Sequence, residues 1–137
     1  MPELVIDASA TLPWCFGDEA TDFTRQLLRY ATAGAKIGAP AHWPTEVLNG
    51  LIRAKRRGRA TDVQITRFLA DLNSLNILID RRYGLAHWEN LRRLADKYLL
   101  TSYDAAYLEL AIRSELPLAT LDAALRKAAT EEQVQLL

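Results

Sequence analysis

Short runs of apolar residues alternate with longer stretches of helical periodicity along this chain, a pattern typical of βαβ units and a largely parallel sheet. The first run, Leu4-Val5-Ile6, has no polar position and ends abruptly at Asp7. Unbroken apolar succession fits a strand that is buried on both faces, as in a parallel sheet covered by helices. The expected fold class is α/β, a three-layer α/β/α domain around a central, mostly parallel sheet.

The same patterns predict the remaining elements. Further strands are expected over residues 36–40, 76–80 and 117–120, with a final edge strand over 134–137. Helices are expected over residues 18–33, 44–57, from 61 onward, 84–98, 103–111 and 122–129. Gly34 and Gly58 are expected to end the first two of these helices. Helical spacing also assigns several large apolar residues to inward-facing sides, among them Tyr30, Leu48, Val63, Leu69 and Trp88.

Length and composition fit one domain, 1–137, with a full hydrophobic core. Half of the 137 residues are hydrophobic and a quarter are charged, and no apolar run approaches the roughly 20 residues of a membrane span. Asp7 interrupts the first apolar run too early for a signal peptide. Cys15 is the only cysteine, so an internal disulfide is excluded and nothing argues for secretion. The expected compartment is the cytoplasm.

The formal charge is zero, with 17 basic and 17 acidic residues, which by itself predicts no general attraction to nucleic acid. If four acids are set aside as a metal-binding cluster, thirteen remain and the rest of the chain carries +4. A neutral total can therefore conceal an acidic site within a basic surround. The charge count alone decides nothing.

Four acids occupy related places in the predicted elements: Asp7, Glu46, Asp104 and Asp122 each follow a strand or lie in the first turn of a helix. In open α/β sheets such positions converge outside the carboxyl ends of the strands, where ligands bind. Each acid alone also fits a helix-capping role. Together, four carboxylates would repel one another, and a divalent cation such as Mg²⁺, which prefers oxygen ligands, would relieve that repulsion. Such a cation acidifies a coordinated water and stabilises phosphoryl oxygens, so the set points to Mg²⁺- or Mn²⁺-dependent phosphodiester hydrolysis.

Other kinds of site have no support in the sequence. Zinc would require Cys or His ligands at short spacing, whereas His42, His87 and Cys15 are scattered. The chain contains no G-x-S-x-G, P-loop or G-x-G-x-x-G motif. A phosphoaspartyl phosphatase would need a second acid two residues after Asp7, where Ser9 stands.

Taken together, four segments resemble the PIN-domain ribonucleases, and most closely the VapC-type toxins of toxin–antitoxin pairs. The segments are Val5-Ile6-Asp7-Ala8-Ser9-Ala10, Pro44-Thr45-Glu46-Val47-Leu48-Asn49, Tyr103-Asp104-Ala105-Ala106-Tyr107 with Leu110-Ala111, and Ala119-Thr120-Leu121-Asp122. Any one alone would be a weak signal, but their order and spacing are specific. The resemblance covers essentially the whole chain.

The resemblance implies a PIN-like fold and an endoribonuclease that uses Mg²⁺ or Mn²⁺. Asp7, Glu46 and Asp104 match the central metal-binding acids, and Asp122 matches the fourth, which often reaches the metal through water. Ser9 and Thr120 match supporting hydroxyl positions, and Asn49 matches a polar position of the toxin branch. The resemblance also implies a cognate antitoxin that covers the active-site side, and a homodimer or a higher toxin–antitoxin assembly.

Arg53 is the basic residue best placed to contact RNA, because it shares a helix face with Glu46. The rest of the basic run, to Arg59, also fits a solvated helix end. Trp14, Cys15 and Phe16 form an apolar knot that would suit either a docking surface or ordinary core. Two other functions remain open: a housekeeping PIN nuclease without an antitoxin, and a non-catalytic binding module whose acids serve only as caps.

Overall fold

A four-stranded parallel sheet forms the centre of the computed structural model, which describes residues 1–137. Its strands are β1 (Leu4–Ile6), β2 (Ile37–Pro40), β3 (Ile77–Asp80) and β4 (Leu118–Ala119), in the order β3-β2-β1-β4. β1 pairs with β2 at Leu4↔Ile37 and with β4 at Val5↔Leu118. The three residues of β1 are at most 1% exposed, as expected for an apolar strand in the middle of a covered sheet.

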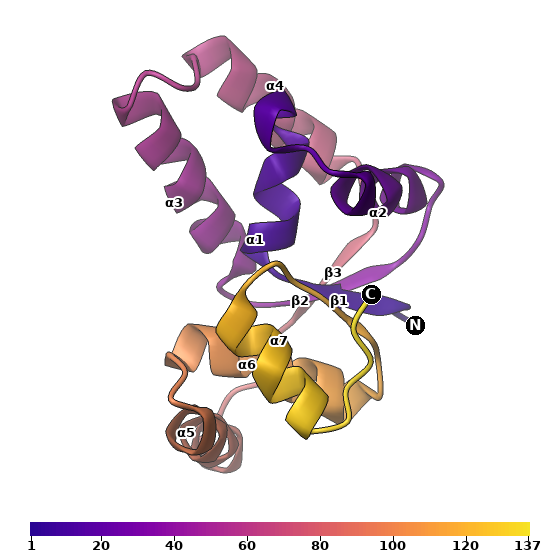
Figure 1. The fold of residues 1–137 in the computed structure, drawn as a ribbon, viewed down its shortest axis with the longest axis vertical. Helices are drawn as coiled ribbons and strands as arrows, with labels where there is room; N and C mark the ends of the chain where they lie inside the picture. The colour runs from indigo at the N-terminus through magenta and orange to yellow at the C-terminus, as the bar shows by residue number, and fades with distance from the viewer.

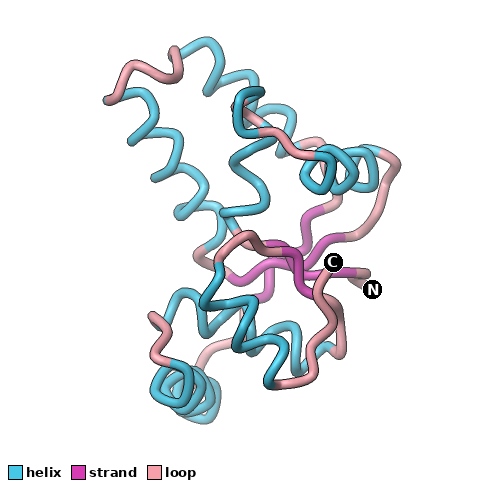
Figure 2. The backbone as a smooth tube through the Cα atoms, in the orientation of Figure 1, coloured by secondary structure: helices cyan, strands magenta, loops and turns pink.

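Helices cover both faces of this sheet (Figures 1 and 2). One layer contains α1 (Ala8–Thr11), α2 (Asp22–Thr32), α3 (Trp43–Arg56) and α4 (Asp62–Asn73), together with two 3₁₀ turns, η1 (Leu12–Trp14) and η2 (Gly17–Glu19). The other layer contains α5 (Leu85–Tyr98), α6 (Ser102–Ser114) and α7 (Ala123–Glu131). The expected three-layer α/β/α fold with a parallel sheet is confirmed.

Threonine caps determine where several helices begin. Thr21 and Thr61 accept hydrogen bonds from the backbone N–H groups three residues later, both at 3.2 Å, and the side chains of Thr24 and Gln64 bond back to the caps. This reciprocal capping box fixes the start of α2 at Asp22 rather than at residue 18, because residues 17–19 form a separate 3₁₀ turn. The helix predicted to begin at residue 18 was therefore placed four residues too early.

Several apolar side chains that helical spacing assigned to the core are exposed: Tyr30, Leu48, Val63, Leu69 and Trp88. α3 and α4 form a hairpin that extends away from the sheet, so the α4 residues far from the sheet lack a covering layer (Figure 1). α5 packs mainly against α6, and only its Leu94 is fully buried. The pattern identified the right helices but overestimated how much of each is covered.

The C-terminal segment differs from the prediction as well. Residues 134–137 make only a single bridge, Leu118↔Leu136, instead of a full edge strand.

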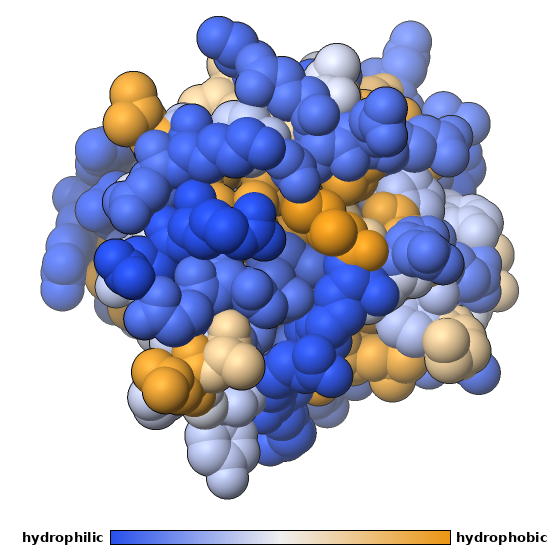
Figure 3. Space-filling view, turned by 90° about the horizontal axis from the view of Figure 1, so that it is seen from below, coloured by the Kyte–Doolittle hydropathy of each residue, from blue (hydrophilic) through white to orange (hydrophobic).

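Gly34 and Gly58 follow α2 and α3 with φ of +103° and +75°, a conformation that glycine adopts without strain, and both predicted helix stops are confirmed. No helix has the length and apolar character needed to span a membrane. From the α5–α7 side the surface is mostly hydrophilic, with separate apolar patches (Figure 3).

Candidate active site

Asp7 directly follows β1, at the carboxyl end of that strand, and is only 3% exposed. Its carboxylate caps α1 by accepting from the Ala10 N–H at 3.0 Å, and it accepts from the Ser9 hydroxyl at 2.7 Å. Thr120, at the end of the neighbouring β4, also donates its hydroxyl to this carboxylate. The capping role and the site position therefore coincide in one residue. Burial raises the pKa of Asp7 despite these three donors.

Ser9 and Thr120 join the two strand ends into one hydrogen-bonded unit. Besides donating to Asp7, Ser9 accepts from the Leu121 N–H at 2.9 Å. Thr120 accepts from the Asp122 N–H at 3.0 Å and is fully buried. The two hydroxyls thus fix the Asp7 carboxylate to the backbone that leads into α7.

Glu46 lies in the first turn of α3, and the buried Tyr107 of α6 donates its hydroxyl to it. His42, the residue before α3, packs edge-on against Tyr107 with ring centroids 5.0 Å apart. Its Nε2 is buried, makes no hydrogen bond and lies 4.0 Å from Glu46 Oε1. Tyr107 therefore holds the Glu46 carboxylate from the opposite helical layer.

Asp104 and Asp122 complete the acidic set from the α6–α7 layer. Asp104 is in the first turn of α6, and its side chain accepts no hydrogen bond, whereas Asp122 caps α7 by accepting from the Leu125 N–H at 2.8 Å. Burial, followed by the negative charges of Asp122, Glu46 and Asp7, raises the pKa of Asp104 to about 6. Asp104 is thus near enough to the other three acids at this sheet edge to be affected by their charges.

No Lys or Arg forms an ion pair with any of the four carboxylates, although Lys and Arg form eight ion pairs with other acids of the fold. An all-oxygen donor set without a cationic partner fits Mg²⁺ or Mn²⁺ chemically. In the present arrangement, no group of three or more Asp, Glu, His or Cys side chains is close enough to hold a metal ion. Mg²⁺ usually keeps several waters and binds proteins through one or two carboxylates.

A cavity of about 590 Å³ includes one of the four acids, Glu46, in its wall, together with Ser9. Asn49 and Arg53, which lie on the same face of α3 as Glu46, line it as well. The structure thus places both polar candidates beside the acidic cluster. Their roles stay predictions.

Comparison with known proteins identifies the family. The PIN-domain family model matches residues 4–131, nearly the entire chain. The chain belongs to the PIN-domain family. PIN domains are generally metal-dependent nucleases, so membership indicates a nuclease. A search of curated proteins found no significant match.

A solved structure with the same fold as this PIN domain is described as "Crystal Structure of PAE2754 from Pyrobaculum aerophilum". The match covers 93% of this chain and 84% of that chain, with a TM-score of 0.72 and 24% sequence identity. At that identity, the likeness supports the fold alone.

A fifth acid at the same sheet edge, Asp80 at the end of β3, does not join the site. Its carboxylate accepts from Arg113 at 2.7 Å, and Arg113 also donates to the buried Glu109 at 2.8 Å. His87 Nδ1 lies 3.4 Å from Glu109 as well. In this PIN domain an arginine therefore neutralises Asp80, whereas the four candidate acids at the same sheet edge have no Lys or Arg partner.

Sequence reasoning missed three residues beside the site: His42, Tyr103 and Arg126. Arg126 was not a candidate from the sequence, but its guanidinium donates to the Thr120 carbonyl at 2.9 Å. The i to i+4 spacing of Asp122 and Arg126 on α7 was the available signal. His42, just before α3, and Tyr103, in the first turn of α6, come from opposite helical layers and meet at the carboxyl edge of the sheet, a contact that no local pattern reveals.

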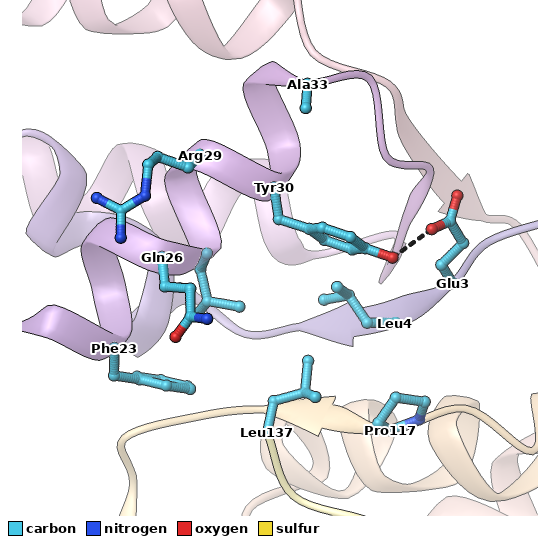
Figure 4. Close-up of a pocket in the computed structure, with 10 residues that line it drawn as sticks. Glu3, Leu4, Phe23, Gln26, Arg29, Tyr30, Ala33, Pro117 and Leu137 are labelled. Carbon is cyan, nitrogen blue, oxygen red and sulfur yellow. Dashed lines mark hydrogen bonds between the residues drawn. The ribbon is translucent and has the colours of Figure 1, made fainter.

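Another cavity, of about 610 Å³, lies at the opposite edge of the sheet, between α2, the start of β1 and Leu137 (Figure 4). Six of its ten lining residues are hydrophobic, and its Glu3 accepts a hydrogen bond from Tyr30. Because this cavity holds one carboxylate that is already bonded, the acidic cluster is the better candidate for the active site of the PIN domain.

Proposed function

We propose that the protein is an endoribonuclease that hydrolyses RNA phosphodiester bonds with Mg²⁺ or Mn²⁺. The observation that carries the proposal is the cluster of four carboxylates, partly buried and without a basic partner, at the carboxyl edge of a parallel sheet. Asp7, Glu46, Asp104 and Asp122 would hold the cation. When bound, the cation would acidify a coordinated water and neutralise charge on the phosphoryl oxygens.

The protein's own residues support this chemistry in distinct ways. Thr120 and Ser9 fix the orientation of Asp7, and Tyr107 fixes that of Glu46. Asp104, which no side-chain hydrogen bond restrains, is free to adjust to the cation. Hydrogen-bonded supports behind such acids typically change metal affinity or activity by about 10–100-fold when removed.

The biological role we propose is the toxin of a type II toxin–antitoxin pair, acting in the cytoplasm and restrained by a cognate antitoxin. The motif resemblance over the four segments supports this role. Exposed apolar side chains on α3 and α4, such as Leu48 and Val63, provide surface on which an antitoxin or a second copy could pack. Phe16, by contrast, is buried, and Trp14 donates its Nε1–H to the Thr24 carbonyl at 2.9 Å, so this knot is packing rather than docking surface.

The nuclease is tested by incubating the purified protein with total cellular RNA, with Mg²⁺ or Mn²⁺ and with EDTA. We expect discrete products only with metal, and a loss of at least about 100-fold for Asp104→Asn, which removes one metal-holding charge without losing a hydrogen bond. Asp80→Asn is the matched control, because it changes an acid at the same sheet edge that Arg113 already neutralises. Cleavage that survives Asp104→Asn would refute the assignment of the site.

The toxin role needs a separate experiment. Induced expression in a bacterial host should arrest growth for the wild type and not for Asp104→Asn, and co-expression of the adjacent gene product should relieve the arrest. RNA cleavage without growth arrest would favour a housekeeping PIN nuclease. A folded protein whose binding and activity ignored the Asp104 substitution would favour a non-catalytic binding module.

A further inference from the structure

The cavity beside the acids has an aromatic wall that the metal chemistry does not use. Tyr103 lines it and is 60% exposed, although it directly precedes Asp104 on α6. Its ring centroid lies 5.4 Å from that of His42 at an angle of 52°, and His42 packs in turn against Tyr107. The tyrosine ring is therefore supported by tilted and edge-on aromatic contacts, while much of its surface remains exposed.

The remaining wall is polar and can form hydrogen bonds. Thr45 and Asn49 of α3 line it with exposed side chains, as does Arg53 one turn further on. Arg53 forms no ion pair, whereas two other members of the basic run do: Lys55 pairs with Asp62 at 2.6 Å, and Arg59 pairs with Asp18 at 3.0 Å. One cation is thus left beside the cavity for a ligand.

The cavity volume of about 590 Å³ falls within the range of small-ligand sites, which is about 300–1,000 Å³. An aromatic face, an amide, a hydroxyl and a free guanidinium are the groups with which proteins bind an unstacked nucleobase and its adjacent phosphate. Base stacking on an aromatic ring is possible only where the base is not already stacked in a duplex.

We propose that this cavity is a nucleobase subsite next to the scissile phosphate, in which Tyr103 stacks on a base and Arg53 contacts a neighbouring phosphate. The inference rests on the proposed ribonuclease function and adds to it a residue that positions the RNA strand. Asn49 and Thr45 face the same cavity and would contact the edge of the base. Tyr103 is in this account a substrate-binding residue, distinct from the acids that hold the cation.

The test measures binding of a fluorescein-labelled ten-nucleotide RNA of mixed sequence by anisotropy with Mg²⁺, in an Asp104→Asn background that cannot cleave. Tyr103→Ala should weaken binding roughly five- to hundredfold, the range associated with one base–aromatic stack. Tyr103→Phe and Tyr103→Trp should bind nearly as well as the parent, because they keep an aromatic face. Tyr83→Ala, at an exposed tyrosine outside the cavity, is the matched control and should change nothing.

A blunt RNA duplex of the same sequence separates stacking from other effects. Its bases are already stacked, so Tyr103→Ala should leave duplex binding unchanged. Equal loss for the duplex and the single strand, or no loss for the single strand, would overturn the subsite. If the Asp104→Asn parent binds neither RNA, the ribonuclease proposal fails first and the subsite falls with it.

Discussion

Asp104→Asn should make the metal-free protein more stable while it abolishes activity. Asp104 is the one acid of the site whose side chain accepts no hydrogen bond, so the amide loses no partner. Its pKa is raised from 3.8 to about 6 by burial and by the three neighbouring carboxylates. Above pH 6 the folded protein must hold this carboxylate ionised in a place that disfavours the charge, and the unfolded chain has no such cost.

The size of the effect follows from the pKa difference between the folded and unfolded states. Each pKa unit corresponds to about 1.36 kcal/mol, so a rise from 3.8 to about 6 sets an upper limit of about 3 kcal/mol. Asp104 is only half-buried, and solvent screening reduces the expected gain to on the order of 1 kcal/mol. For a domain of this size, that gain raises the Tm by roughly 3–5 °C.

The sign of the pH dependence is equally specific. Because the folded state binds the proton more tightly than the unfolded state, the free energy of unfolding of the wild type should fall as pH rises from about 4 to about 6. Asp104→Asn should lack that part of the decline.

Thermal and urea unfolding at pH 4.5 and pH 7.5, in EDTA, provide the measurement, with Asp80→Asn as the control that should lose stability through its broken pair with Arg113. A Tm for Asp104→Asn at pH 7.5 that is equal to or below that of the wild type would refute the electrostatic account. Adding Mg²⁺ should stabilise the wild type more than the variant, because only the wild type retains the full acidic set.

Three further substitutions test the supports of the site and the packing behind it. Thr120→Val should cost about 1–3 kcal/mol of stability, measured by urea unfolding, because it removes one of the three donors to the Asp7 carboxylate and the acceptor of the Asp122 N–H. Thr120→Ser should retain both hydrogen bonds. Tyr107→Phe should lower activity about 10–100-fold by releasing Glu46, with far-UV circular dichroism unchanged; unaltered activity would contradict the positioning role. Arg113→Met should destabilise the protein by about 3–5 kcal/mol, because two carboxylates lose their cation, and a loss below about 1 kcal/mol would show that the network contributes little.

The sequence predicted the sheet, and the places of the four acids at a strand end or helix start, because both depend on local patterns. An apolar run that stops at an acid, as in Leu4 to Asp7, specifies a buried strand and a polar group at its end. Glu46, Asp104 and Asp122 follow the same logic at helix starts. Parallel topology then brings such positions to one edge of the sheet.

The misplaced assignments depend on contacts that local patterns do not contain. Trp88 and Val63 have the right helical spacing for burial, but no neighbouring layer reaches them. Asp80 resembles the four candidate acids in sequence, and only Arg113, 33 residues later, distinguishes it. Tyr107 belongs to one of the motif segments, yet its bond to Glu46 links residues 61 apart.

The pairing of β1 with β4 determines when the site can exist during synthesis. Asp7 receives its hydrogen bond from Thr120, 113 residues later in the chain, and the central strand lacks one neighbour until Leu118 and Ala119 have emerged. Contacts of such long sequence separation form late and slow folding, since a large loop must close first. A nascent chain that ends before residue 118 therefore carries Asp7, Glu46 and Asp104 without Asp122 and without the Thr120 hydroxyl that orients Asp7. The complete set of four acids can therefore assemble only after residue 122 has left the ribosome.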